Sequence, residues 1–88
     1  MTCKVQREVI GTDCVVLHVS GRITGDHVDT FRALLEEESG ALTLDLKNVR
    51  LVDGEAVSLL VIQESSGVRI TNCPMYIREW MRREQEAH

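Results

Sequence analysis

Residues 42–62 constrain the fold most, because one short stretch combines a strand signal with a helix signal. Leu42, Leu44 and Leu46 alternate with polar residues, a period of two that predicts a strand with one buried face. Asp53 then stands where the N-cap of a helix belongs, and an almost wholly apolar segment follows it. The stretch therefore predicts a strand over 41–46 and a helix over 54–65.

The rest of the chain predicts three more strands and two more helices. Strands are expected over 3–10, 14–20 and 68–72, with a hairpin loop at 11–13 and a second loop at 21–25. A helix is expected to begin at Asp26, and the last helix at Pro74, whose missing N–H costs nothing there. In the first of these helices the expected buried stripe is Val28, Phe31, Leu34 and Leu35. In the last, Tyr76, Ile77, Trp80 and Met81 share one arc.

This order of elements, β-β-α-β-α-β-α, predicts an α/β fold. Strand–helix–strand units favour right-handed crossovers and a mixed, mainly parallel four-stranded sheet. The strands alternate instead of being continuously apolar, so we expect helices on one face and an open second face. The residues expected on the open face are Val16, His18, Thr43, Asp45, Arg69 and Thr71. Residues 1–88 are expected to form a single domain.

Composition excludes several classes of function. The net charge is −4, and the basic residues are scattered among glutamates, which argues against nucleic acid and anionic membranes as partners. No apolar run approaches the roughly 18 residues that a membrane-spanning helix needs. The first residues lack the apolar segment of a signal peptide, so the expected compartment is the cytoplasm.

Catalytic and metal chemistry is not indicated by the sequence. The three cysteines are widely spaced, without a C-x-x-C pair, and the three histidines are isolated from one another. His18 is expected to be a partly exposed strand residue without a metal or catalytic role. We therefore predict a protein that is not an enzyme and that needs no cofactor or metal.

These features together resemble the STAS family, the anti-sigma factor antagonist domain of bacteria. The resemblance runs from about Val15 to Trp80. Residues 15–24 resemble the family's second strand with its Gly-x-[Leu/Ile] exit, and Thr24 stands where the family often has Asp. Residues 42–46 resemble the strand before the family's switch loop. Residues 72–80 resemble a subgroup of short, stand-alone members.

The switch motif of the family, Asp-Ser-[Ser/Thr]-Gly, falls on a degenerate sequence here. The matching residues are Asp53, Gly54, Glu55 and Ala56, so the serine that is phosphorylated in relatives is absent. Glu55 is either a permanent charge in place of phosphate or an ordinary carboxylate at a helix start. Ser58 lies one turn further on. The resemblance implies no switching by phosphorylation at the family site.

The resemblance implies a non-catalytic protein-interaction module. Its partner would be an anti-sigma-factor-like kinase or another STAS protein, and a homodimer is a further option. The partner-binding residues would be those of the switch loop: Asp53, Gly54, Glu55, Ala56 and Ser58. In the helix over 54–65, Val57, Leu60 and Val61 are expected to be buried, whereas Leu59 and Ile62 point elsewhere. With Thr24, these two are the expected interface residues. The alternative is a small-molecule or lipid-binding domain of the same fold.

Overall fold

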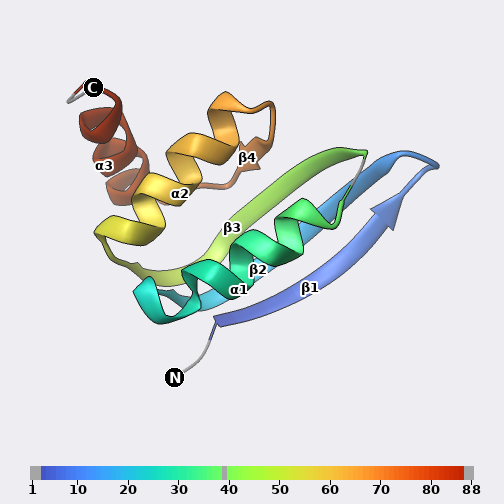
Figure 1. Ribbon diagram of the computed structural model, residues 1–88, viewed down its shortest axis with the longest axis horizontal. Coiled ribbons are helices and arrows are strands. Elements are labelled where there is room, and N and C mark those ends of the chain that lie inside the picture. Colours follow the sequence, from blue (N-terminus) through green and yellow to red (C-terminus); the bar gives the residue numbers. More distant parts are fainter. Residues whose placement is uncertain (1–2, 39, 87–88) are drawn as a thin grey trace.

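The computed structural model describes residues 3–38 and 40–86 and contains the predicted series of elements (Figure 1). In chain order they are β1 (Cys3–Ile10), β2 (Cys14–Ile23), α1 (Gly25–Glu36), β3 (Ala41–Val52), α2 (Gly54–Ser65), β4 (Arg69–Thr71) and α3 (Met75–Glu86). The α/β class and the order of elements predicted from the sequence are confirmed.

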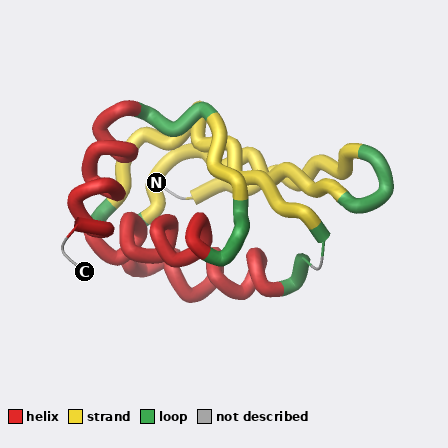
Figure 2. The backbone as a smooth tube through the Cα atoms, turned by 90° about the horizontal axis from the view of Figure 1, so that it is seen from above, coloured by secondary structure: helices red, strands yellow, loops and turns green. Residues whose placement is uncertain are grey.

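The four strands form one mixed sheet in the order β1-β2-β3-β4. β1 pairs with β2 antiparallel, whereas β2 with β3 and β3 with β4 pair parallel. Figure 2 shows the helices gathered on one side of the sheet, with α3 standing at its end, where it packs against α2. The other face of the sheet is open. The predicted arrangement, with helices on one face, is confirmed.

The core lies between the sheet and the helices and is built mainly from aliphatic side chains. Every second residue of β2 and of the first half of β3 points into it, as the alternation predicts. The buried strand residues of this pattern are Val15, Leu17, Val19, Leu42, Leu44 and Leu46. Phe31 of α1 is 1% exposed and closes the core from the helix side.

Leu34 is an exception to the predicted buried stripe of α1. Its side chain is 37% exposed, whereas Val28, Phe31 and Leu35 are buried. Leu34 lies at the β1 edge, where it lines a cavity of about 100 Å³ together with Val5. This side of the stripe is therefore only partly covered.

β2 and β3 are longer than predicted, because both continue through residues that were expected to be loops. β2 extends to Ile23 and β3 to Val52. The register between them shifts twice, between His18 and Ser20 and between Gly21 and Arg22, and each shift gives β3 one extra residue. Such β-bulges break the period of two on which the strand prediction depends. Beyond Leu46 the buried residues of β3 are therefore Val49 and Val52.

Two helix starts also differ from the predictions by one residue. α1 begins at Gly25, with Thr24 as its N-cap, and not at Asp26. α3 begins at Met75, because Pro74 precedes the helix and its carbonyl accepts the N–H groups of Ile77 and Arg78. The predicted N-cap of α2, Asp53, is confirmed.

Candidate functional site

Asp53 joins the starts of two helices. Its Oδ1 accepts the N–H of Ala56 at 3.0 Å, and its Oδ2 accepts the N–H of Gly25 at 2.7 Å. One half-buried carboxylate therefore bonds the first turn of α2 and the first residue of α1. Both amides belong to helix N-termini, which have unpaired N–H groups and favour negative charge. Asp53 thus supplies the cap that Thr24 does not provide, since Thr24 forms no side-chain cap hydrogen bond.

The parallel pairing of β2 and β3 brings these helix starts together. Ile23 is paired with Val52 at the carboxyl ends of the two strands, and each strand leads directly into a helix (Figure 1). The N–H of Asp53 also donates to the carbonyl of Ile23 at 3.3 Å. In open α/β sheets the carboxyl ends of the strands are the usual place for a binding site. We call this region, residues 24–25 and 53–58, the switch edge.

Glu55 lies over the start of α1. A Cβ atom built on Gly25 would stand only 2.9 Å from Oε1 of Glu55, so the glycine leaves the space that the carboxylate occupies. Glu55 and Gly54 are exposed, whereas Asp53 is half-buried beneath them. The switch edge therefore presents an acidic turn to solvent on a backbone that Asp53 holds in place.

The structure separates the predicted interface residues into accessible and inaccessible ones. Ser58 and Thr24 are half-buried, and Ile62 is 56% exposed. The prediction that Leu59 points away from the core is wrong, because Leu59 is 2% exposed. α2 packs against both α1 and α3, and its buried residues belong to the same core cluster as those of the sheet, so it is covered on more than one side. Ala56 is 0% exposed, so its side chain is not available to a partner either.

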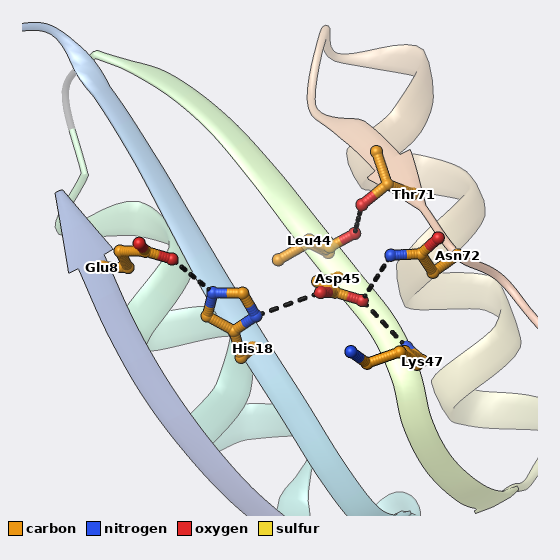
Figure 3. Close-up of polar contacts among 7 residues, drawn as sticks. All are labelled: Glu8, His18, Leu44, Asp45, Lys47, Thr71 and Asn72. Atoms are coloured by element: carbon orange, nitrogen blue, oxygen red, sulfur yellow. Dashed lines mark hydrogen bonds and ion pairs between the residues drawn. The ribbon is translucent and has the colours of Figure 1, made fainter. Parts of the chain in front are cut away.

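A second polar cluster lies on the open face of the sheet and was not predicted (Figure 3). His18 Nε2 lies 2.7 Å from Glu8 Oε1, and His18 Nδ1 lies 3.0 Å from Asp45 Oδ2. The other oxygen of Asp45 accepts the N–H of Lys47 at 3.0 Å and the side-chain amide of Asn72 at 3.1 Å. We call Glu8, His18 and Asp45 the histidine clamp.

The strand register explains this contact. His18 of β2 is directly paired with Asp45 of β3. Glu8 of β1 is paired with Val16, which is two residues before His18 and therefore on the same face of the sheet. Asn72 adopts φ 53°, a conformation that asparagine tolerates, and this turn ends β4 beside Asp45. The sequence placed His18 and Asp45 on one face, but the pairing partner of a strand residue depends on the register.

The geometry of the clamp favours a positively charged imidazole. Carboxylates only accept hydrogen bonds, so both ring nitrogens of His18 must donate to satisfy the two contacts. The hydrogen bond to Glu8 raises the pKa of His18 most; desolvation opposes it, and Asp45 adds to the rise. Partial burial works against ionisation of Asp45, but hydrogen bonds from Lys47, Asn72 and His18 lower its pKa overall. The clamp is therefore an ion-paired cluster at pH values below the raised pKa of His18.

Residues 3–38 and 40–86 contain no group of three or more His, Cys, Asp or Glu side chains placed to hold a metal ion. Within the same ranges, none of the helices has the length and apolar character required to cross a membrane.

Comparison with known proteins supports the resemblance seen in the sequence. The sequence model of the family described as "Mlab, STAS domain" matches residues 7–83. No curated protein matches the chain by sequence.

Solved structures with this fold are similar at low sequence identity. The STAS-domain antisigma-factor antagonist of Rhodobacter sphaeroides is 19% identical with a TM-score of 0.65, over 80% of this chain and 86% of that one. The anti-sigma factor antagonist SpoIIAA in its unphosphorylated form is 15% identical with a TM-score of 0.60, over 85% and 79%. A Shewanella loihica protein with a SpoIIAA-like fold is 13% identical with a TM-score of 0.55, over 77% and 65%. The family match covers most of the chain and the structures share its fold; the chain therefore belongs to the STAS domain family and resembles anti-sigma factor antagonists.

Proposed function

We propose that this STAS domain is a non-catalytic interaction module that binds an anti-sigma-factor-like partner in the cytoplasm through the switch edge. The observation that carries the proposal is the double cap by Asp53, which fixes an exposed Gly54–Glu55 turn at the start of α2. A surface that is ordered before binding loses less conformational entropy when a partner docks. The partners we favour are a kinase of the anti-sigma type or another STAS protein.

The accessible side of α2 supports this choice. Glu55, Ser58 and Ile62 are three and four residues apart, a spacing that places them along one side of a helix. Ile62 is an exposed apolar side chain at one end of this stripe, and Glu55 supplies a charge at the other. An apolar anchor with polar neighbours is a common arrangement in protein interfaces.

We also propose that the family phosphorylation site does not operate in this chain. Neither Gly54 nor Glu55 has a hydroxyl group. Glu55 carries one negative charge permanently, whereas a phosphate adds nearly two and three strong acceptor oxygens. The free energy of partner binding therefore depends on Glu55 at all times and is not switched by a kinase at this position.

Binding of an apolar or lipid ligand as the main function is less well supported. The apolar cavity between β1 and α1 has about 100 Å³, below the roughly 300 Å³ at which small-molecule pockets begin. It also lies between β1 and α1, away from the exposed side of α2.

The test is direct binding to purified candidate partners, with two matched variants. Ile62→Asp places a charge in the α2 stripe, and Leu34→Asp does the same at an exposed leucine of α1. We expect Ile62→Asp to weaken binding of an anti-sigma-type kinase or STAS partner at least about tenfold, and Leu34→Asp to change it little. Equal effects of both variants would contradict docking through α2. Sedimentation of the wild type alone decides whether the partner is a second copy.

Incubation with ATP and the kinase, followed by intact mass measurement, tests the second proposal. We expect no added phosphate on the wild type. Stoichiometric phosphate at Ser58 would overturn the claim. Glu55→Ser restores a hydroxyl, and if Glu55 acts as a substitute for phosphate, this variant captures the kinase more tightly. If Glu55→Ser binds the kinase with the same affinity as the wild type, Glu55 is an ordinary carboxylate at a helix start and not a substitute for phosphate.

A further inference from the structure

The basic residues without ion pairs gather on the strands. Arg7, Arg32, Arg78 and Arg82 each pair with a glutamate or aspartate. Within residues 3–38 and 40–86, ion pairs are absent for six other Lys and Arg residues, of which only Arg83 lies in a helix and five lie in strands: Lys4, Arg22, Lys47, Arg50 and Arg69. Most of the carboxylates lie in the helices instead. Three of the unpaired strand residues, Arg22, Lys47 and Arg50, lie on the neighbouring strands β2 and β3.

The two bulges of β3 bring three of these cations together. Lys47 and Arg50 fall at the two positions where the register with β2 shifts, and Arg22 lies across from the second shift. Gly21 adopts φ 88° between them, a conformation that residues with side chains rarely adopt. Bulges redirect side chains and often adjoin functional sites.

A groove follows the bulges. One part has a volume of about 480 Å³ and the adjoining part about 710 Å³, and both are lined by Gly21 and Arg50. We call this surface the bulge groove. Its lining residues with donor side chains are Ser20, Arg22, Lys47, Asn48 and Arg50. None of its lining residues is acidic, in a chain whose net charge is −4.

The backbone of the groove is held at both bulges. Asp45 Oδ1 accepts the N–H of Lys47 at 3.0 Å, as Figure 3 shows. The hydroxyl of Tyr76, at the start of α3, donates to the carbonyl of Arg50 at 2.8 Å. Two bonds from outside the bulges therefore fix the segments that carry the cations, so less ordering is needed when a ligand binds.

The lining chemistry selects a class of ligand. The guanidinium, ammonium, hydroxyl and amide groups of the lining all donate hydrogen bonds, and two kinds of them are positively charged. A ligand that matches them is an oxyanion that carries more than one negative charge. The lining contains no aromatic side chain on which a nucleobase could stack. Its one exposed large apolar residue, Leu51, offers little room for a lipid chain.

We propose that the bulge groove binds a small phosphate-type oxyanion, such as a phosphorylated metabolite in solution. Lys47, Arg50 and Arg22 supply the charge, and Ser20 and Asn48 supply neutral donors. The groove lies on β2 and β3 and includes no residue of the α2 stripe, so anion binding is independent of the protein docking proposed above. Failure of either proposal leaves the other standing.

Titration of the whole chain with pyrophosphate, followed by amide NMR shifts, tests the proposal. We expect saturable shifts centred on Gly21, Lys47 and Arg50, with a dissociation constant on the order of 1 mM or tighter. Raising the salt from about 50 mM to about 200 mM should weaken binding, as for any ligand held by charge. Shifts that do not saturate, or that spread over all basic residues alike, would overturn it.

Variants localise the effect. The double variant Lys47→Gln, Arg50→Gln removes two charges from exposed positions. It keeps the backbone N–H of Lys47 and the carbonyl of Arg50, so the hydrogen bonds to Asp45 and Tyr76 can still form. We expect it to bind pyrophosphate at least about tenfold more weakly. Arg83→Gln in α3 removes a charge outside the groove and should leave binding unchanged. An unchanged constant in the double variant would contradict the proposal. So would binding to phosphatidic acid vesicles without binding to pyrophosphate, which would assign the groove to a membrane surface.

Discussion

The switch edge and the histidine clamp both hold carboxylates in place, but with different donors. Asp53 is bonded by the backbone amides of Gly25 and Ala56, which do not titrate. The carboxylates of the clamp are bonded by His18, a side chain that is 39% exposed and changes charge near neutral pH. The switch edge is therefore built to keep one shape, whereas the open face of the sheet responds to pH and salt.

The largest effect should come from removing a core side chain of α2. Leu59→Ala deletes a side chain that is 2% exposed and should lower the free energy of unfolding by about 2–5 kcal/mol. Ile62→Ala, one turn away at a 56% exposed position, should cost less than about 1 kcal/mol. Urea unfolding measures both. Similar losses would mean that α2 is not fixed into the core as described.

Asp53→Ala should be next in size, because it removes both bonds at the switch edge. We expect a loss of about 2–4 kcal/mol in the free energy of unfolding. Asp53→Asn should lose about half as much, since an amide has a single acceptor oxygen and can cap one helix only. Asp29→Ala, whose side chain is 94% exposed, is the matched control and should have little effect. If Asp53→Asn equals the wild type, the double cap is wrong.

The clamp should give a smaller effect that depends on pH. The pKa of His18 in the folded protein is raised above its value of about 6.5 in the unfolded chain. The charged imidazole therefore stabilises the folded state fully below about pH 6.5, and this contribution is lost as the pH rises through the folded pKa. The contribution of Asp45, whose pKa is lowered, is present above its unfolded value of about 3.9 and is lost only as the pH falls through the folded value.

His18→Gln should therefore destabilise the protein more at about pH 5.5 than at about pH 8.5. Chemical denaturation at the two pH values measures the difference, and an NMR titration of the ring gives the pKa directly. The same loss at both pH values, or a pKa of His18 at or below about 6.5, would show that the clamp does not hold an imidazolium.

The smallest effect is expected from Glu55→Gln. This change removes the exposed charge at the switch edge but keeps the size of the side chain, and the helix start loses about 0.3–0.5 kcal/mol of favourable charge interaction. Thermal unfolding at low salt is the suitable measurement. A loss as large as that of Asp53→Ala would mean that Glu55, and not Asp53, holds the edge together.

The sequence predicted the features that depend on local pattern. Alternation at Leu42, Leu44 and Leu46 predicted a strand with one buried face, and Asp53 before an apolar segment predicted the N-cap of α2. Both signals are local: burial of alternate side chains determines the first, and a hydrogen bond across one helical turn determines the second. The order of such segments was then enough to predict the sheet and its covered face.

The features that were missed depend on contacts between distant residues. The bond from Gly25 to Asp53 spans 28 positions, and that from His18 to Asp45 spans 27. The last residues of β2 and β3 were not predicted to be strand, because each bulge adds a residue that interrupts the alternation of buried and exposed side chains. Leu59 was misplaced because a helix covered on more than one side has no single buried stripe, and periodicity does not tell which side stays exposed.

The single carboxylate of Asp53 also has a dynamic consequence. The amides of Gly25 and Ala56 share one acceptor group, although they belong to different helices. Local opening of either helix start releases Asp53 and removes the protection of the other amide from hydrogen exchange, so the two should open as one cooperative unit. A protein bound to the start of α2 would thereby slow exchange at the start of α1, a region it need not touch.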